Sequence, residues 1–337
     1  MTEIYLIRHG EAEGNVFRRL HGQYDSLLMP RGYRQRDCLQ ERFSGIAVDG
    51  CFSSDLTRAC LTAQSICVPK GLPLHRDARF RELNVGVWED MAYGYLHTFY
   101  PRDMHAFSHD PKNWQVCGSE RYSDYTDRFI DGMKAAAEQY PGGTVAIFCH
   151  GAVLRGTLMH LFFHDSAQGL PISDNTGVCR IFYDQGSFSY EYLNDNSHIP
   201  VELSTYYIQS WWRDTDNRKE ADLYFLPYAG ESIGAALPPW EEGGRRMTAW
   251  LYSGPVGVVS LGRQEEDCGR IIGMSLREDM LGRGYADQLL GCAVSHFRRL
   301  GCRRLQLLPG QYPEDIASRY AFDSRTLTRS IDPKAAL

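Results

Sequence analysis

Short apolar runs alternate with helix-like segments along the first 200 residues of the chain. Residues 4–7 form an apolar run, and so do residues 145–149 after Thr144; such runs are typical of strands buried inside a parallel sheet. Three segments have the pattern of helices, at residues 32–43, 57–68 and 122–140. Strands that alternate with helices predict an α/β fold with a mostly parallel, doubly wound sheet and helices on both faces.

Less regular segments complete this first region. Residues 46–56 and 72–83 each predict one more strand, and residues 177–195 predict a hairpin that turns at Gln185-Gly186. Residues 93–114 are rich in aromatic side chains and histidine and show little periodicity, which favours a helical insertion.

The alternation breaks near Pro200, where we place a domain boundary between residues 1–200 and 201–337. The second region predicts a smaller α/β domain with a mixed sheet. Its expected elements are a hairpin at residues 250–262, strands at 270–276 and 303–309, and a helix at 284–300. The length of 337 residues lets each domain bury a core of its own, so we expect two separate cores.

Composition narrows the class of protein. A net charge of −6 argues against a nucleic-acid or anionic-membrane partner. The apolar stretch at residues 153–163 is interrupted by Arg155 and His160 and is too short to span a bilayer, and we see no signal peptide. Ten cysteines without a C-x-x-C pair indicate free thiols. We therefore expect a cytoplasmic protein.

The candidate chemistry lies where two of the apolar strands end. The first strand runs into Arg8-His9-Gly10, and the strand at residues 144–149 runs into His150-Gly151. The carboxyl ends of parallel strands meet at one edge of a sheet, where ligands usually bind. Each residue alone is also compatible with an ordinary strand end.

Further segments decide between these interpretations. In chain order they read "RHGEAEGN", "HGQYDSLL", "SSDLTRACLTA", "RELNVGVWE", "CHGAVLRG" and "YLNDNSHI". This ordered set resembles the histidine phosphatase (phosphoglycerate mutase-like) superfamily. The resemblance implies that His9 is a nucleophile that forms a phosphohistidine and that Glu82 is the general acid. It implies a phosphate site without metal, made by Arg8, Asn15, Arg58, His150 and Gly151.

The residue types suit this chemistry. Phosphoryl transfer needs an in-line nucleophile, positive charge around the equatorial oxygens and an acid at the leaving oxygen. Arg8, Arg58 and His150 can supply the charge that Mg²⁺ supplies in other enzymes. The expected substrate is a small phosphorylated metabolite. Hydrolysis is favoured over a mutase reaction, because mutases of the superfamily usually carry a longer insertion than residues 83–114.

Two departures from the family pattern concern the surroundings of the site. Met29 stands where the family usually has threonine, and "CGSERYSD" replaces the more usual "GGES". In the insertion, His105 and His109 lie one helical turn apart, a spacing that can hold a metal. No acidic partner follows the first histidine, so we expect a polar helix face and no metal.

A second candidate site lies in the C-terminal region. The strand at residues 270–276 leads through Gly282-Arg283-Gly284 into a helix, which makes a cradle for an anion such as a pyrophosphate. Residues 240–323 resemble GNAT-type N-acetyltransferases, whose loop reads R/Q-x-x-G-x-G/A. Gly284 and Ala286 match this loop, while Leu281 occupies the Arg/Gln position. The resemblance implies acetyl-CoA as cofactor, bound by Leu281, Gly282, Arg283, Gly284, Tyr285 and Ala286.

The acetyl-transfer chemistry is less defined. Tyr320 lies near the place of the family's tyrosine acid, but Ser324 and Arg325 replace the usual "GF" after it. Glu265, Glu266 and Asp267 are equally well explained as turn residues, so no general base is assigned. The chain is thus expected to be a phosphatase fused to an acetyltransferase. The alternatives are a phosphatase with a non-catalytic acetyl-CoA-binding or scaffold module, and a phosphoglycerate-type mutase.

Overall fold

The computed structural model describes residues 1–209, 218–313 and 315–337. Its first sheet has six strands in the order β4-β3-β6-β1-β7-β8, of which the first four are parallel. β7 and β8 are antiparallel and form the predicted hairpin. The strands are β1 (Thr2–Arg8), β3 (Gly50–Ser53), β4 (Leu74–Arg76), β6 (Thr144–Cys149), β7 (Val178–Asp184) and β8 (Ser187–Asp195).

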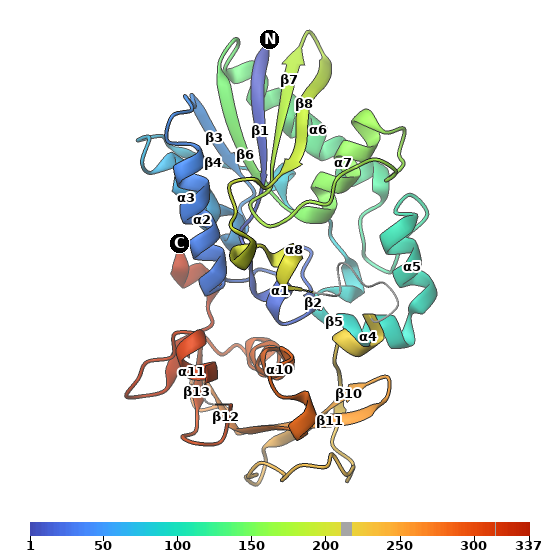
Figure 1. Cartoon of the computed structure of the whole chain (residues 1–337), viewed down its shortest axis with the longest axis vertical. Coiled ribbons are helices and arrows are strands. Elements are labelled where there is room, and N and C mark those ends of the chain that lie inside the picture. The colour runs from blue at the N-terminus through green and yellow to red at the C-terminus, as the bar shows by residue number, and fades with distance from the viewer. Residues whose placement is uncertain (210–217, 314) are drawn as a thin grey trace.

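Both faces of this sheet are covered, as the alternation of strands and helices predicts (Figure 1). The helices are α2 (Pro30–Arg42), α3 (Thr57–Cys67), α6 (Tyr122–Gln139) and α7 (Gly151–Phe162). Tyr5 and Ile7 of β1 pack toward α2 and α3, whereas Ile4 and Leu6 pack toward α6 and α7. The register places the ends of β1, β6 and β3 at one edge of the sheet.

Two irregular segments differ in how well the sequence predicted them. The predicted strand at residues 72–83 is wrong beyond β4, because Asp77 caps a 3-10 turn (Ala78–Phe80) that carries Phe80 into the core. The helical insertion is confirmed as α4 (Tyr93–Phe99) and α5 (Pro101–His109), where Pro101 begins the second helix.

The second sheet also has six strands, in the order β14-β13-β12-β11-β10-β9. Only β12 and β13 pair in parallel, so the predicted mixed sheet is confirmed. Its strands are β9 (Tyr224–Pro227), β10 (Arg245–Leu251), β11 (Gly254–Leu261), β12 (Cys268–Leu276), β13 (Arg304–Leu307) and β14 (Thr328–Ser330). The helix α10 (Tyr285–Arg299) packs on β11 and β12.

The remaining elements are short. They are α1 (Glu13–Val16), β2 (Arg19–Leu20), β5 (Met91–Ala92), α8 (Thr205–Ile208), α9 (Arg218–Ala221) and α11 (Asp315–Arg319). All ten cysteines are free thiols, as predicted. No helix in the described parts of the chain has the length and apolar character needed to cross a bilayer.

The expectation of two separate cores is wrong. Phe17 and Met29, from the first region, belong to the same buried cluster as the second sheet and α10. Gly291 of α10 allows this contact, since a Cβ there would lie 2.4 Å from the Cβ of Phe17. The carboxylate of Glu13 is fully buried and pairs with Arg298 of α10 at 2.6 Å.

The end of the chain returns to the first region. The 3-10 turn Pro333–Ala336 lies beside α3, and Figure 1 shows the C-terminus next to α2 and α3. Ala336 packs against Leu61 and its neighbours, and the Thr57 hydroxyl donates to the carbonyl oxygen of Pro333 at 3.2 Å. The two regions therefore meet at a second place, beside α3.

Candidate active site

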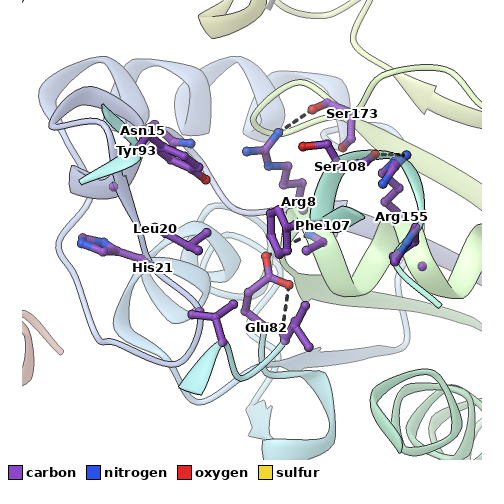
Figure 2. Close-up of a pocket in the computed structure, with 18 of the residues that line it drawn as sticks. Arg8, Asn15, Leu20, His21, Glu82, Tyr93, Phe107, Ser108, Arg155 and Ser173 are labelled. Atoms are coloured by element: carbon purple, nitrogen blue, oxygen red, sulfur yellow. Dashed lines mark hydrogen bonds between the residues drawn. The ribbon is translucent and has the colours of Figure 1, made fainter. Parts of the chain in front are cut away.

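A cavity of about 450 Å³ opens at the carboxyl edge of the first sheet. Figure 2 shows residues from several elements that point into it. The residues that the sequence assigned to phosphate chemistry and that line it are Arg8, His9, Asn15, Arg58, Glu82 and Gly151. His150 lies directly behind this lining, with its ring centroid 5.1 Å from that of His9. The structure thus brings the whole predicted set together.

His9 follows β1 and is held as a neutral imidazole. Its Nδ1 lies 2.7 Å from the carbonyl oxygen of Gly10. A carbonyl can only accept, so Nδ1 carries the proton and Nε2 has the free lone pair. Burial, together with the nearby cations Arg58 and Arg8, lowers the pKa of His9 well below its ordinary value. The imidazole is therefore neutral and carries no proton on Nε2, as a nucleophile requires.

Arg58 stands in the first turn of α3 and is only 2% exposed. Its guanidinium donates to the carbonyl oxygens of Gly22 at 2.7 Å and Tyr24 at 2.9 Å. Arg8 donates to the carbonyl oxygen of Ser173. These carbonyl groups orient the two guanidinium groups without neutralising their charge, so the pocket suits an anion.

His150 is completely buried at the end of β6. Neither of its ring nitrogens has a hydrogen-bond partner among the described residues. Burial and the charge of Arg58 lower the pKa of His150 well below its ordinary value. A buried imidazole without a partner is unusual, and an oxygen of a bound phosphoryl group beside His9 would satisfy it.

The carboxylate of Glu82 is fixed at the N-terminus of α7. It accepts hydrogen bonds from the backbone N–H of Ala152 at 2.9 Å, Val153 at 2.7 Å and Leu83 at 2.9 Å. These bonds aim the carboxyl group into the cavity at the sheet edge that carries His9. Glu82 is the one acidic residue among the described residues that line this cavity.

Asn15 and Gly151 contribute polar groups in different ways. The side-chain oxygen of Asn15 accepts from the N–H of Ala12 at 3.0 Å, so its amide nitrogen is the atom it can offer to an anion. A Cβ on Gly151 would lie 3.2 Å from Nε of Arg8. The glycine thus lets the start of α7 approach the arginine closely.

The predicted anion cradle in the second region is an exposed turn. Gly282 and Gly284 have φ angles of +73° and +81°, which glycine adopts without strain. A Cβ on Gly282 would meet nothing within 4 Å, and Leu281 and Arg283 are exposed. This turn leads into the N-terminus of α10 and leaves room for a pyrophosphate.

Other predicted residues of this second site lie inside the protein. The Tyr285 side chain is buried and its hydroxyl donates to the carbonyl oxygen of Glu220, so only its backbone faces the turn. Tyr320 is 3% exposed in the shared core, 5.9 Å from the ring of Phe17, and burial raises its pKa. Ala286 is half-buried against the same core.

Two minor sequence interpretations can also be placed. Glu265 and Cys268 bridge a tight turn, so residues 265–267 are turn residues. The rings of His105 and His109 stack with centroids 4.4 Å apart on α5. In the described parts of the chain, no three His, Cys, Asp or Glu side chains gather as a metal site.

Comparison with known protein families shows to which family the chain belongs. Residues 4–196, more than half of its length, match the histidine phosphatase superfamily (branch 1). The chain belongs to this superfamily. Residues 197–321 match the acetyltransferase (GNAT) family, so both predicted resemblances are confirmed. The two matches meet at residues 196 and 197, and our boundary at residue 200 stays a prediction.

Relatives of the histidine phosphatase domain cover different shares of the chain. The probable phosphoglycerate mutase GpmB of Proteus mirabilis is 42% identical over 98 residues, which are 29% of this chain and 46% of that protein. The chain thus spans about half the length of this relative. Its counterpart from Salmonella paratyphi A is 30% identical over 154 residues, 46% of this chain and 72% of the relative.

A solved structure agrees with this assignment. Bacillus stearothermophilus YhfR is 29% identical and superposes with a TM-score of 0.57. The match covers 59% of this chain and 100% of that chain. The fold of the histidine phosphatase domain is therefore that of its superfamily.

The outer wall of the phosphatase cavity comes from the insertion, from α7 and from residues 170–173. In Figure 2, Arg155 and Ser108 stand on one side of the cavity, and Tyr93 and Asn15 on the other. Arg155 donates to the carbonyl oxygen of Ser108 at 3.0 Å. Sequence reasoning missed Arg155, although its place four residues after Gly151 puts both on one face of α7.

We expect Trp114→Ala to change substrate choice more than it changes the intrinsic rate. Trp114 lines the cavity and packs on Phe107 at 4.9 Å and on Trp88 at 5.4 Å. Its removal widens the cavity on the side where we expect the leaving group. The ratio of kcat/KM for 1-naphthyl phosphate to that for p-nitrophenyl phosphate should therefore change about tenfold.

Tyr95→Ala is the matched control for this measurement. Tyr95 belongs to the same insertion as Trp114, but the structure places it outside the cavity lining. Its ring packs on Phe99 at 4.5 Å instead. The substrate ratio should stay unchanged in this variant, and equal changes in both variants would contradict a specific role of the wall.

Proposed function

We propose that the histidine phosphatase domain hydrolyses a small phosphomonoester through a phosphohistidine at His9. The observation that carries this proposal is the neutral imidazole of His9, with Nε2 available, beside buried cations and the unpartnered His150. Nε2 attacks phosphorus, the bond from phosphorus to the ester oxygen breaks, and the leaving oxygen takes the proton of the Glu82 carboxyl group.

Glu82 then reverses its role. As a carboxylate it removes a proton from water, and the resulting hydroxide attacks the phosphohistidine. This releases inorganic phosphate and returns His9 and the protonated Glu82 to their starting states. Arg8, Arg58 and His150 bind the equatorial oxygens, so in our proposal the reaction proceeds without a metal ion.

A mutase reaction is the second candidate, because the curated relatives are named probable phosphoglycerate mutases. A mutase must keep its phosphoryl group and return it to the substrate, whereas a phosphatase transfers it to water. Incubation with 3-phosphoglycerate, followed by phosphorus NMR, separates the two. Release of inorganic phosphate supports hydrolysis, and accumulation of 2-phosphoglycerate without it supports the mutase.

For the C-terminal domain we propose acetyl-CoA binding at residues 281–284 and the start of α10. The two positive φ angles, the open space outside Gly282 and the helix N-terminus support a pyrophosphate site made of main-chain N–H groups. Acetyl-CoA supplies an activated acetyl group when bound. The enclosed Tyr320 keeps open the alternative of a module that binds acetyl-CoA without transferring its acetyl group.

Gly284→Val should weaken acetyl-CoA binding about tenfold or more, measured by titration calorimetry. Valine is strained at φ +81°, and its side chain would stand in the space for the ligand. Gly301→Val is the matched control, since Gly301 has a φ of +84° just beyond the other end of α10 and open space around it. Equal weakening in both variants would indicate strain in the helix rather than a binding site.

A further inference from the structure

One carboxylate of the GNAT domain supports the wall of the phosphatase cavity. Asp222 has a side chain that is only 1% exposed, and it accepts from Nε and from the terminal nitrogen Nη2 of Arg18 at 2.6 and 3.1 Å. Nε2 of His97 lies 3.8 Å from the same carboxylate. The Arg18 guanidinium lies over the ring of Tyr93, 4.7 Å from its centroid. Arg18, His97 and Tyr93 all line the cavity.

The segment that carries Asp222 is fixed to α10 on both sides. The Gln288 side chain accepts from the N–H of Leu223 at 2.7 Å and donates to the carbonyl oxygen of Ala221 at 2.9 Å. The hydroxyl of Tyr285 donates to the carbonyl oxygen of Glu220. The backbone on both sides of Asp222 is thus held by α10 of the GNAT domain, while its carboxylate reaches the phosphatase domain.

The phosphatase domain meets this segment at a glycine of α4. A Cβ on Gly94 would lie 2.3 Å from the carbonyl oxygen of Asp222 and 2.5 Å from the backbone of Leu223. Only glycine allows this approach of the two backbones. This close contact therefore fixes the position of α4, which carries Tyr93 and His97, at the cavity.

We propose that Asp222 is a positioning residue for the part of the phosphatase site that holds the leaving group. This inference rests on the proposed phosphatase function. Asp222 fixes the guanidinium of Arg18 and, through it, the wall formed by Tyr93 and His97. A buried guanidinium that loses its carboxylate must turn toward other oxygens, and the wall then changes shape. Among the described contacts, those of the phosphate-binding groups around His9 do not include Asp222.

Two ligands that occupy different parts of the cavity test this proposal. Their binding is measured by calorimetry on the full chain, in a His9→Ala background that prevents turnover. Inorganic phosphate fills the phosphate site alone, and 1-naphthyl phosphate also fills the leaving-group part. Asp222→Asn should weaken binding of 1-naphthyl phosphate about tenfold and change binding of inorganic phosphate less than about twofold. A purely structural defect would reduce the binding of both ligands together, and that result overturns the proposal.

Two further variants make the test specific. Gly94→Ala pushes the same segment away without changing a charge, and it should reproduce the selective loss even if Asp222→Asn fails to fold. Asp287→Asn removes another buried carboxylate of the GNAT domain, paired with Arg319 at 2.7 Å and outside the cavity lining, and should leave both affinities unchanged. A selective loss in the control, or none in Gly94→Ala, contradicts the role of Asp222.

The same experiment separates the two proposals. Binding is measured without turnover, so a wild-type chain that binds both ligands but releases no phosphate contradicts only the phosphatase proposal. Equal losses of both ligands in an active enzyme contradict only the positioning role. A parent protein that binds neither ligand contradicts both.

Discussion

His9→Ala abolishes turnover of p-nitrophenyl phosphate, with an expected loss of about 10⁴-fold or more, because it removes the atom that would bind the phosphoryl group. In the wild type, burial and two arginines keep the imidazole neutral, and the Gly10 carbonyl directs the lone pair of Nε2 to the substrate. The measurement is steady-state release of p-nitrophenol. Acid-labile phosphate should also be trapped on the wild-type chain and not on the variant.

His105→Ala controls for the loss of a histidine. This residue lies on α5, is exposed and does not line the cavity, so the rate and the labelling should stay at the wild-type level. Treatment of the wild type with EDTA should also leave the rate unchanged, since the proposed charge comes from arginine and histidine side chains. Full activity of His9→Ala, or loss of activity with EDTA, would overturn the mechanism.

Glu82→Gln should slow hydrolysis of an alkyl phosphate about a hundredfold or more, the range of a lost general acid. An amide cannot give a proton to the leaving alkoxide. It also replaces one of the two oxygens that accept from the N–H groups of Ala152 and Val153 with an NH₂ group, which cannot accept. The measurement compares kcat for an alkyl phosphate and for p-nitrophenyl phosphate.

The leaving group is the internal control of this comparison. p-Nitrophenolate leaves without much help from an acid, so its phosphorylation step should slow far less than that of the alkyl ester. Equal slowing with both substrates in a pre-steady-state burst would show that Glu82 acts on the position of the phosphoryl group and not on the leaving oxygen.

The sequence predicted the parts of the molecule that depend on neighbouring residues. Apolar runs marked β1 and β6, and the polar residues directly after them, His9 and His150, meet because parallel strands end at one edge. The short edge strands β9 and β14 escaped notice, since a few half-buried residues leave no alternating pattern.

Contacts between residues far apart in the sequence could not be predicted from hydrophobic periodicity. Arg18 and Asp222 are 204 positions apart, and nothing in either segment alone marks the pair. The same holds for Phe17, which has no distinguishing feature in the sequence and whose contact with Gly291 of α10 only the structure shows. Composition and length predicted two domains but could not show that their cores merge.

The merged core makes a separation of the two domains difficult in evolution. If recombination released the phosphatase half, Phe17 and Met29 would become an exposed hydrophobic patch, and Glu13 would lose its ion pair with Arg298. The other half would lose the residues that fill the space over Gly291. Each half would first need several compensating surface substitutions, so descendants of this chain are expected to inherit both domains or neither.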